Sequence, residues 1–260
     1  DAGEIEASKE NSLPELIELK DIKGDLHVHT KESDGSHSVE ELIDAAREKG
    51  YKYIAITDHS KGLGIARGLN EERVIEEKKQ IDAFNKRLRG FRLLMGLEVD
   101  IRSDGKMDLP DDILSKMDIV VASIHSGFRQ SREQITKRLV SAMKNPYVSV
   151  IAHPTGRLIG ERDPYDLDMD LILKTAKETG TAIEINSYPL RLDLNDINAK
   201  RAKEMGVKIA ISTDAHLVSQ FDYMIYGVSI ARRGWIEKKD VLNAMSYDSL
   251  MKAMQMKRGK

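Results

Sequence analysis

Residues 24–59 read GDLHVHTKESDGSHSVEELIDAAREKGYKYIAITDH, and this stretch decides the fold class. A short apolar run at 24–29 leads through a polar loop into a segment of helical periodicity at 38–49, and a second apolar run follows at 53–57. The helical segment opens with Ser38-Val-Glu-Glu41, a capping box, and is followed by Gly50, a typical C-cap residue. A strand, a helix and a strand in this order are typical of a parallel βα unit.

The same unit recurs along the rest of the chain. Strands are predicted at 24–29, 53–57, 92–99, 119–124, 148–152, 182–186 and 208–212. Helices are predicted at 38–49, 70–88, 131–143, 171–179 and 195–205. We therefore expect an α/β fold with seven parallel strands, most simply a single (βα)7 TIM-like barrel. An open doubly wound sheet is the structural alternative, since the pattern does not show closure.

The composition limits the class of protein. The chain has 260 residues, 40% of them hydrophobic, which is enough for one sizeable core. Its net charge of −2 comes from 41 basic and 43 acidic residues, so no global basic field indicates a nucleic-acid binder. Without cysteine, metal binding is left to His, Asp and Glu. With no apolar stretch of membrane-spanning length and no signal peptide in sight, we expect a cytoplasmic protein with no membrane partner.

The chain places most of its histidines at one kind of position. Six of the seven fall at or just after a predicted strand end. His27 and His29 lie two residues apart in the first strand, so both imidazoles point to the same face. The later strands end in or lead into His59, Glu98, His125, His153, Asp214 and His216. Because the carboxyl ends of parallel strands meet at one edge, we expect these side chains to form one cluster.

Imidazoles combined with carboxylates are ligands suited to Zn²⁺, Mn²⁺ or Fe²⁺. Since a zinc-like ion takes about four protein ligands, this set predicts two or three divalent ions, and Glu98 could bridge a pair. A single His-x-His pair would be weak evidence, because ordinary core histidines also produce it. Asp34 is a further candidate, although Ser33-Asp34-Gly35 is equally an ordinary turn sequence. His37, the remaining histidine, precedes a predicted helix and is expected to cap it or to face solvent.

At these residues the sequence resembles the PHP family, the polymerase and histidinol phosphatase superfamily. Residues 25–35, DLHVHTKESDG, look like its first motif, Thr57-Asp-His59 looks like its second, and the later candidates match its remaining positions in order. The resemblance implies a distorted seven-stranded barrel with a trinuclear metal centre, and one PHP metallo-phosphoesterase domain over 24–260.

Longer matches are similar to the C-terminal PHP domain of bacterial and archaeal family X DNA polymerases. They cover 13–25, 57–69, 184–186 with 191–194, and 226–235. The resemblance implies that residues 1–23 are a linker or N-terminal extension, that an upstream polymerase domain of the same chain is missing here, and that the chain is a fragment, as its start at Asp1 suggests. Nucleotide addition is not expected from this chain.

The family resemblance implies a set of ligands for each of three ions. One ion would be held by His27, His29, Glu98 and Asp214, a second by Glu98, His125 and His153, and a third by Asp34, His59 and His216. Glu98 and His125 are the predicted catalytic residues. The predicted mechanism is in-line attack of a metal-activated hydroxide on phosphorus, without a covalent enzyme intermediate.

The resemblance implies that the substrate is the 3′ end of DNA, cleaved by a 3′-5′ exonuclease or 3′-end-processing phosphodiesterase with Mn²⁺ as the favoured activator. A small-molecule phosphatase of histidinol phosphatase type and a non-catalytic regulatory module are the alternatives. Polar and cationic loop residues predicted to bind substrate are Lys61, Arg67, Arg157, Asn186 and Arg191. Tyr188-Pro189 is expected either to stack on a base or to shape its loop, and the run RRGW at 232–235 either to contact a nucleic-acid backbone or to begin a surface helix.

Overall fold

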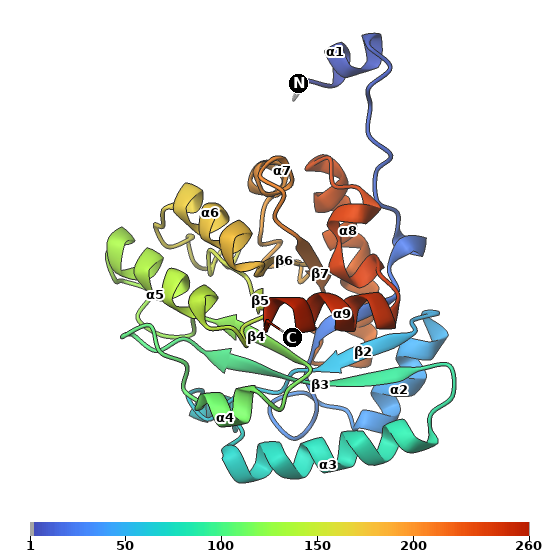
Figure 1. Cartoon of the computed structure of the whole chain (residues 1–260), viewed down its shortest axis with the longest axis vertical. Helices are drawn as coiled ribbons and strands as arrows, with labels where there is room; N and C mark the ends of the chain where they lie inside the picture. The colour runs from blue at the N-terminus through green and yellow to red at the C-terminus, as the bar shows by residue number, and fades with distance from the viewer. Residues whose placement is uncertain (1–2, 260) are drawn as a thin grey trace.

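The computed structural model describes residues 3–259 and contains a seven-stranded parallel sheet in which neighbours follow chain order. The strands are β1 (Gly24–Val28), β2 (Tyr53–Ile56), β3 (Arg92–Asp100), β4 (Ile119–Ser123), β5 (Val150–Ile151), β6 (Ala182–Asn186) and β7 (Ile209–Ser212). Helices surround them as a nearly closed barrel (Figure 1). All seven predicted strands are confirmed, with β5 shortened to two residues.

The α-helices are α1 (Glu4–Lys9), α2 (Val39–Glu48), α3 (Glu71–Arg87), α4 (Asp111–Leu114), α5 (Arg132–Lys144), α6 (Met169–Thr179), α7 (Asp196–Glu204), α8 (Met224–Arg233) and α9 (Tyr247–Lys257). Short 3₁₀ helices are η1 (Leu19–Asp21), η2 (Gly64–Ala66), η3 (Val218–Tyr223), η4 (Lys238–Asp240) and η5 (Leu242–Ala244). The predicted capping box of α2 is present, since Ser38 Oγ accepts from Glu41 N and Glu41 accepts from Ser38 N. The expectation that 232–235 begins a helix is wrong: Arg232 and Arg233 end α8, and Gly234 and Trp235 form the turn that follows it.

Strand β3 gives the barrel its distortion. Its first half, from Arg92 to Met95, pairs with β2, and its second half, from Gly96 to Asp100, pairs with β4. The strand changes partner at Gly96, where a Cβ atom would lie 2.9 Å from the carbonyl oxygen of Ile56 and 2.8 Å from Ile119 Cγ2. Glycine is required here because only a residue without a side chain lets β2 and β4 approach β3 this closely.

The barrel closes between β1 and β7 through side chains and one isolated bridge, Val28 to Ala215. Asp25 accepts hydrogen bonds from the backbone and hydroxyl of Thr213. At the other end of the seam, the Asn243 amide donates to the carbonyl oxygens of Gly24 (2.8 Å) and Ile211 (2.7 Å). These contacts satisfy backbone groups that a regular ladder would otherwise pair.

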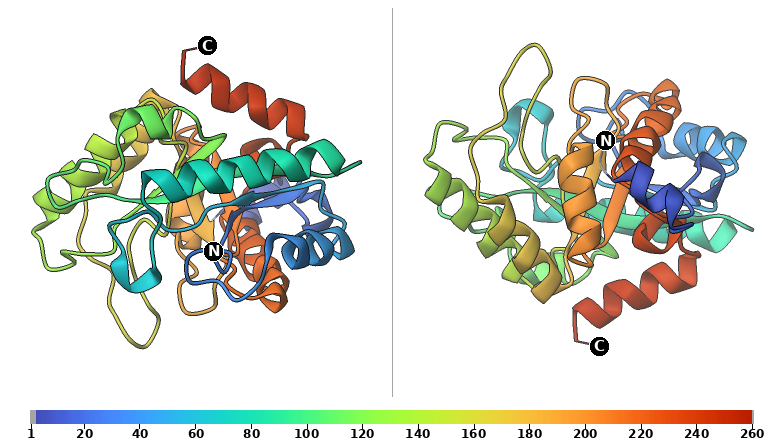
Figure 2. Two further views of the ribbon diagram at one scale, coloured as in Figure 1. Left: turned by 90° about the horizontal axis from the view of Figure 1, so that it is seen from below. Right: turned by 90° about the horizontal axis from the view of Figure 1, so that it is seen from above.

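Two buried clusters hold the structure together. The larger packs the helices against the outside of the sheet, and the smaller fills the barrel with residues such as Leu26, Ala55 and Val121. Leu250 and Met254 of α9 belong to the smaller cluster, and Tyr53 at the start of β2 donates to the Met245 carbonyl. Helix α9, seen at one edge of the molecule in Figure 2, therefore covers the amino ends of the strands and leaves the carboxyl ends for the site.

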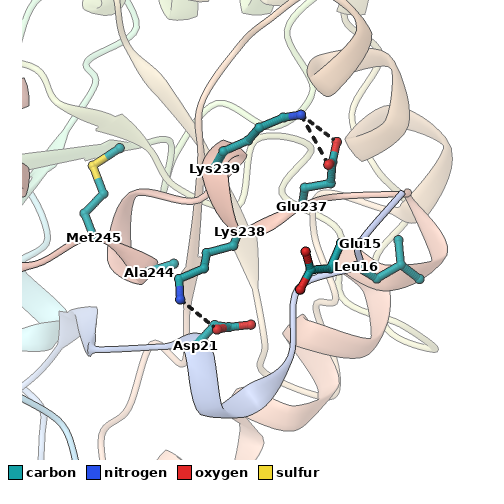
Figure 3. Close-up of a pocket in the computed structure, with 8 residues that line it drawn as sticks. All are labelled: Glu15, Leu16, Asp21, Glu237, Lys238, Lys239, Ala244 and Met245. Carbon is teal, nitrogen blue, oxygen red and sulfur yellow. Dashed lines mark hydrogen bonds and ion pairs between the residues drawn. The ribbon is translucent and has the colours of Figure 1, made fainter. Parts of the chain in front are cut away.

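The N-terminal segment expected to be a linker is partly packed onto the barrel. Ile17 and Ile22 are buried, and Leu16 bridges to Glu237. Lys238 pairs with Asp21 at 3.0 Å across a pocket (Figure 3) that lies beside η4 and η5, away from the histidines. Helix α1 and the segment that leads from it to the barrel extend from the body of the molecule (Figure 1). The domain boundary at 24 stays a prediction, and residues 1 and 2 lie outside the described part.

Candidate metal centre

Side chains from six strands meet at the carboxyl end of the barrel, with Glu98 at their centre. The Glu98 carboxylate lies close to five imidazoles: His59 Nδ1 and His153 Nε2 at 3.0 Å, His27 Nε2 and His125 Nε2 at 3.3 Å, and His29 Nε2 at 3.5 Å. Glu98 is fully buried, because β3 carries it into the barrel mouth. A carboxylate surrounded in this way can serve two ions at once.

A second focus lies at the seam between β1 and β7. His29 Nε2 lies 3.1 Å from Asp214 Oδ1, and His216 Nε2 lies 3.3 Å from Asp34 Oδ1. His59 approaches the same Asp34 carboxylate at 3.4 Å. All nine side chains predicted as ligands are thus gathered in one place.

Three subsets bring one ligand atom each to within 4.8 Å of one another. They are His27, His29, Glu98 and Asp214; His29, Asp34, His59 and His216; and His59, Glu98 and His125. The first subset equals the one that the family resemblance implies. The third differs from the expected set, because it contains His59 in place of His153. His153 Nε2 still lies 3.0 Å from Glu98 Oε1.

The donor atoms fit divalent cations. His27 Nε2, His29 Nδ1, His59 Nδ1 and His153 Nδ1 are buried and make no hydrogen bond. Unpaired polar atoms inside a protein are costly, and several in one cluster point to a missing partner. Nitrogen and carboxylate oxygen are the ligand types that Zn²⁺ and Mn²⁺ accept. The residues present therefore fit the ions that the sequence predicts.

The electrostatics of the cluster are balanced between carboxylates and imidazoles. Burial opposes charge on Glu98 and Asp214, but the surrounding histidines hold the pKa of both carboxyls well below their usual range. Burial alone would lower the pKa of His59, yet the charges of Glu98 and Asp34 raise it to about 10. Burial and the neighbouring His216 and His59 lower the pKa of His29 to about 4. Without cations, protons on some imidazoles balance the buried carboxylates.

Glu184 of β6, which was not predicted as a site residue, contacts two of the predicted ligands. Its Oε1 lies 2.8 Å from His27 Nδ1, and its Oε2 accepts from His153 N at 2.7 Å. A carboxylate can only accept, so His27 carries its proton on Nδ1 and keeps Nε2 free as a ligand atom. The signal was present in the sequence, since a carboxylate in an otherwise apolar strand is rarely buried without a partner.

Asp58 and Asp100 play similar supporting parts and were also missed. Asp58, next to His59, accepts from Thr30 N (2.7 Å) and Thr30 Oγ1 (2.6 Å) and fixes the loop after β1. Asp100, two residues beyond Glu98, accepts from His125 N at 3.2 Å. The two-residue spacing that linked His27 to His29 would also have linked Glu98 to Asp100.

The residues predicted to bind substrate are spread unevenly. Among the four cations of this set, the described structure pairs Arg191 with a predicted ligand, with Nε 3.5 Å from Asp214 Oδ2. Arg157 donates from Nε to the Arg191 carbonyl (2.7 Å) and braces that loop. Lys61 pairs with Glu71 at 2.5 Å, and Arg67 is exposed. These positions make Arg191 the cation best placed to meet a phosphate.

Asn186 does not face open space, as the prediction of a substrate contact required. It is fully buried, and its amide nitrogen donates to Glu184 Oε2 and Asp214 Oδ2, both at 3.1 Å. Its oxygen accepts from Tyr188 N at 3.0 Å. Asn186 therefore orients Asp214 and connects the cluster to the loop that follows β6.

A family model and several proteins of known sequence match this chain. A family model described as "PHP domain" matches residues 25–188. The chain is 51% identical over 232 residues to "DNA polymerase/3'-5' exonuclease PolX" of Bacillus subtilis, covering 89% of this chain and 41% of that protein. It is 35% identical over 235 residues to "Probable phosphatase Teth514_1060" of Thermoanaerobacter sp., covering 84% of this chain and 89% of that protein.

Among solved structures, the fold resembles histidinol phosphate phosphatase from Lactococcus lactis, crystallised with zinc, L-histidinol and phosphate. The TM-score is 0.58 at 17% identity, over 83% of this chain and 94% of that one. In the described residues, 3–259, no helix has the length and apolar character needed to cross a bilayer.

Proposed function

This chain belongs to the PHP domain family, a family of metal-dependent phosphoesterases, and on that premise we propose that it is a 3′-5′ exonuclease or 3′-end-processing phosphodiesterase acting on DNA. The observation that supports this most directly is the 51% identity to a protein named as a polymerase and 3′-5′ exonuclease. Because the chain spans about two fifths of that relative, we propose that it corresponds to the exonuclease part.

In this proposal the cluster holds two or three divalent ions, with Mn²⁺ the favoured activator. His27, His29, Glu98 and Asp214 would hold one ion, and the sets around Asp34 and around His125 would hold the others. Bound there, such ions acidify water and neutralise charge on the phosphate oxygens. His153, beside Glu98, would complete the group on that side.

The chain's own residues orient the parts of the reaction. Glu98, buried among five imidazoles, would offer its two carboxylate oxygens as ligands to the ions. Arg191, whose side chain is 17% exposed and lies 3.5 Å from Asp214, would bind a non-bridging phosphate oxygen. Asp34 and His216, about one third exposed, mark the side from which a substrate would enter.

A small-molecule phosphatase is the second candidate, because the relatives that match over most of both chains are named probable phosphatases. The two functions use the same ions and differ in what surrounds them. A phosphatase for a small monoester needs a closed pocket around the whole substrate, whereas an exonuclease needs an open side for the rest of the strand.

One assay separates the candidates. The purified chain with Mn²⁺ is given end-labelled single-stranded DNA and, separately, histidinol phosphate. Stepwise shortening of the DNA supports the exonuclease; turnover of the monoester alone supports the phosphatase; turnover of neither supports a non-catalytic module. Glu98→Ala should reduce either activity to background while leaving the circular dichroism spectrum unchanged, and Glu178→Gln, on the exposed side of α6, should match the wild type.

A further inference from the structure

A row of three tyrosines begins two residues after Asn186, in the loop that follows β6. The Tyr188 and Tyr223 ring centroids are 5.8 Å apart at an interplanar angle of 61°, and those of Tyr223 and Tyr226 are 6.0 Å apart at 40°. The three residues come from the loop after β6, from η3 and from α8. Exposure rises along the row: Tyr188 and Tyr223 are half-buried, and Tyr226 is 47% exposed.

The two segments that carry Tyr188 and Tyr223 are hydrogen-bonded to residues of the site. Tyr188 N donates to Asn186 Oδ1, and the Tyr188 carbonyl accepts from Arg191 N at 2.8 Å. In η3, the segment that carries Tyr223, Gln220 Oε1 accepts a hydrogen bond from His216 N at 2.6 Å. The backbone that carries Tyr188 is therefore bonded to Arg191, and η3, which carries Tyr223, is bonded to His216.

Helix α8 approaches the loop after β6 closely enough to keep the row together. A Cβ atom at Gly227 would lie 2.0 Å from Ser187 Oγ, so glycine is required for this contact. Tyr226 precedes Gly227 and Tyr188 follows Ser187, and the close approach brings their two elements side by side. The three rings therefore lie in a continuous row across the loop after β6, η3 and α8.

Resting on the proposed function, we infer that this row, Tyr188, Tyr223 and Tyr226, is a stacking surface for the unpaired nucleobases of a single-stranded 3′ end. Aromatic side chains bind bases of any sequence because every base has a π-face. Tyrosine suits a half-exposed position, since its hydroxyl stays wet while its ring packs. The adjoining cluster and Arg191 would hold the phosphates of the same strand.

Charge favours stacking over a basic groove as the source of affinity. The chain is close to neutral, and Lys49, the cation that η3 contacts, already pairs with Asp222. A duplex binder draws most of its affinity from many phosphate contacts. An unpaired strand offers exposed bases instead, which is what this surface can bind.

The test compares two single-stranded oligonucleotides that differ only in their last three 3′ positions, one normal and one abasic. Steady-state cleavage is measured with Mn²⁺ for the full chain and for Tyr223→Leu, Tyr226→Leu and Tyr226→Phe, and binding of the 5′-labelled strands is measured by fluorescence anisotropy. Tyr247→Leu, a partly buried tyrosine on α9 at the other end of the barrel, is the matched control.

We expect the abasic strand to have a KM roughly tenfold or more above the normal one for the wild type, Tyr226→Phe and Tyr247→Leu. In the two other leucine variants the ratio should fall towards one, with kcat little changed. If these variants keep the wild-type ratio, the stacking surface is refuted while the exonuclease stands. If no variant cleaves DNA but binding still depends on the bases and on Tyr223 and Tyr226, the exonuclease is refuted and the surface is supported.

Discussion

Replacing Glu184 by glutamine should weaken metal binding although Glu184 is not itself expected to touch an ion. The side chain is fully buried and accepts hydrogen bonds on both oxygens, from His27 Nδ1 at 2.8 Å and from His153 N at 2.7 Å. Asn186 donates to the second oxygen as well. A glutamine of the same shape must place its NH₂ group against one of these donors.

The orientation of the glutamine amide decides whether His27 keeps its ligand nitrogen. The backbone N–H of His153 cannot change, so an NH₂ group facing it leaves two buried donors opposed. Facing His27, the NH₂ group is satisfied if the imidazole moves its proton from Nδ1 to Nε2. Nε2 is the atom directed at Glu98 and Asp214, and a protonated nitrogen cannot bind a cation. The cheaper orientation therefore removes one ligand.

Loss of such a supporting partner typically costs a factor of roughly 10–100 in metal affinity, or about 1.4–2.7 kcal/mol. The affinity for Mn²⁺ or Zn²⁺ is measured by competition with a chelating dye, and activity is measured across metal concentrations, where excess metal should restore turnover. Glu178→Gln is the control for a charge change far from the cluster. Equal affinity of Glu184→Gln and the wild type for every ion would refute this account of His27.

Three further outcomes follow from other parts of the molecule. Metal uptake at pH 7 should release protons, and the apparent metal affinity should rise with pH. The reason is that the neighbouring carboxylates outweigh burial and hold the pKa of His59 at about 10. A pH-stat measures the proton release, and a metal affinity that does not change with pH would contradict the prediction. Burial lowers the pKa of Lys257 from 10.5 to about 8. The folded state therefore binds this proton less tightly, and the wild type should gain stability relative to Lys257→Met as pH rises through that interval; an unchanged difference in urea unfolding would count against it. Gly96→Ala should destabilise the barrel by about 1–3 kcal/mol in the same assay, since its Cβ would press on Ile56 and Ile119; wild-type stability would show that β3 can move.

The strands and the ligand cluster could be predicted because both follow from short-range rules. Apolar runs separated by helical segments fix a parallel sheet, and a parallel sheet brings the residues at its carboxyl ends together. Glu98, near the end of β3, and His125, just after β4, for example, are separated in sequence but lie on neighbouring strands. Helix α9 was missed, although Ser246 caps it and Leu250 and Met254 repeat at helical spacing, because it covers one end of the barrel and belongs to no βα unit.

The substrate-binding residues could not be assigned from sequence because loop cations choose their partners in three dimensions. Lys61 pairs with Glu71, and Arg157 with backbone carbonyls, while Arg191 reaches Asp214. All three are cations in loops that follow strands, and nothing local separates them. Asn186 shows the same limit, since its strand-end position is as compatible with holding Asp214 as with facing substrate.

The seam between β1 and β7 joins the closure of the barrel to the construction of the site. These strands lie at opposite ends of the sheet order and are far apart in sequence, so their meeting carries a high entropic cost. Yet the seam contributes His29 from one side and Asp214 from the other, 3.1 Å apart. Ions held by this pair would bind the closed barrel and not the open chain, and mass action would then favour closure. Cations bound here would therefore add to the stability that Asp25 and Asn243 already give the seam between β1 and β7.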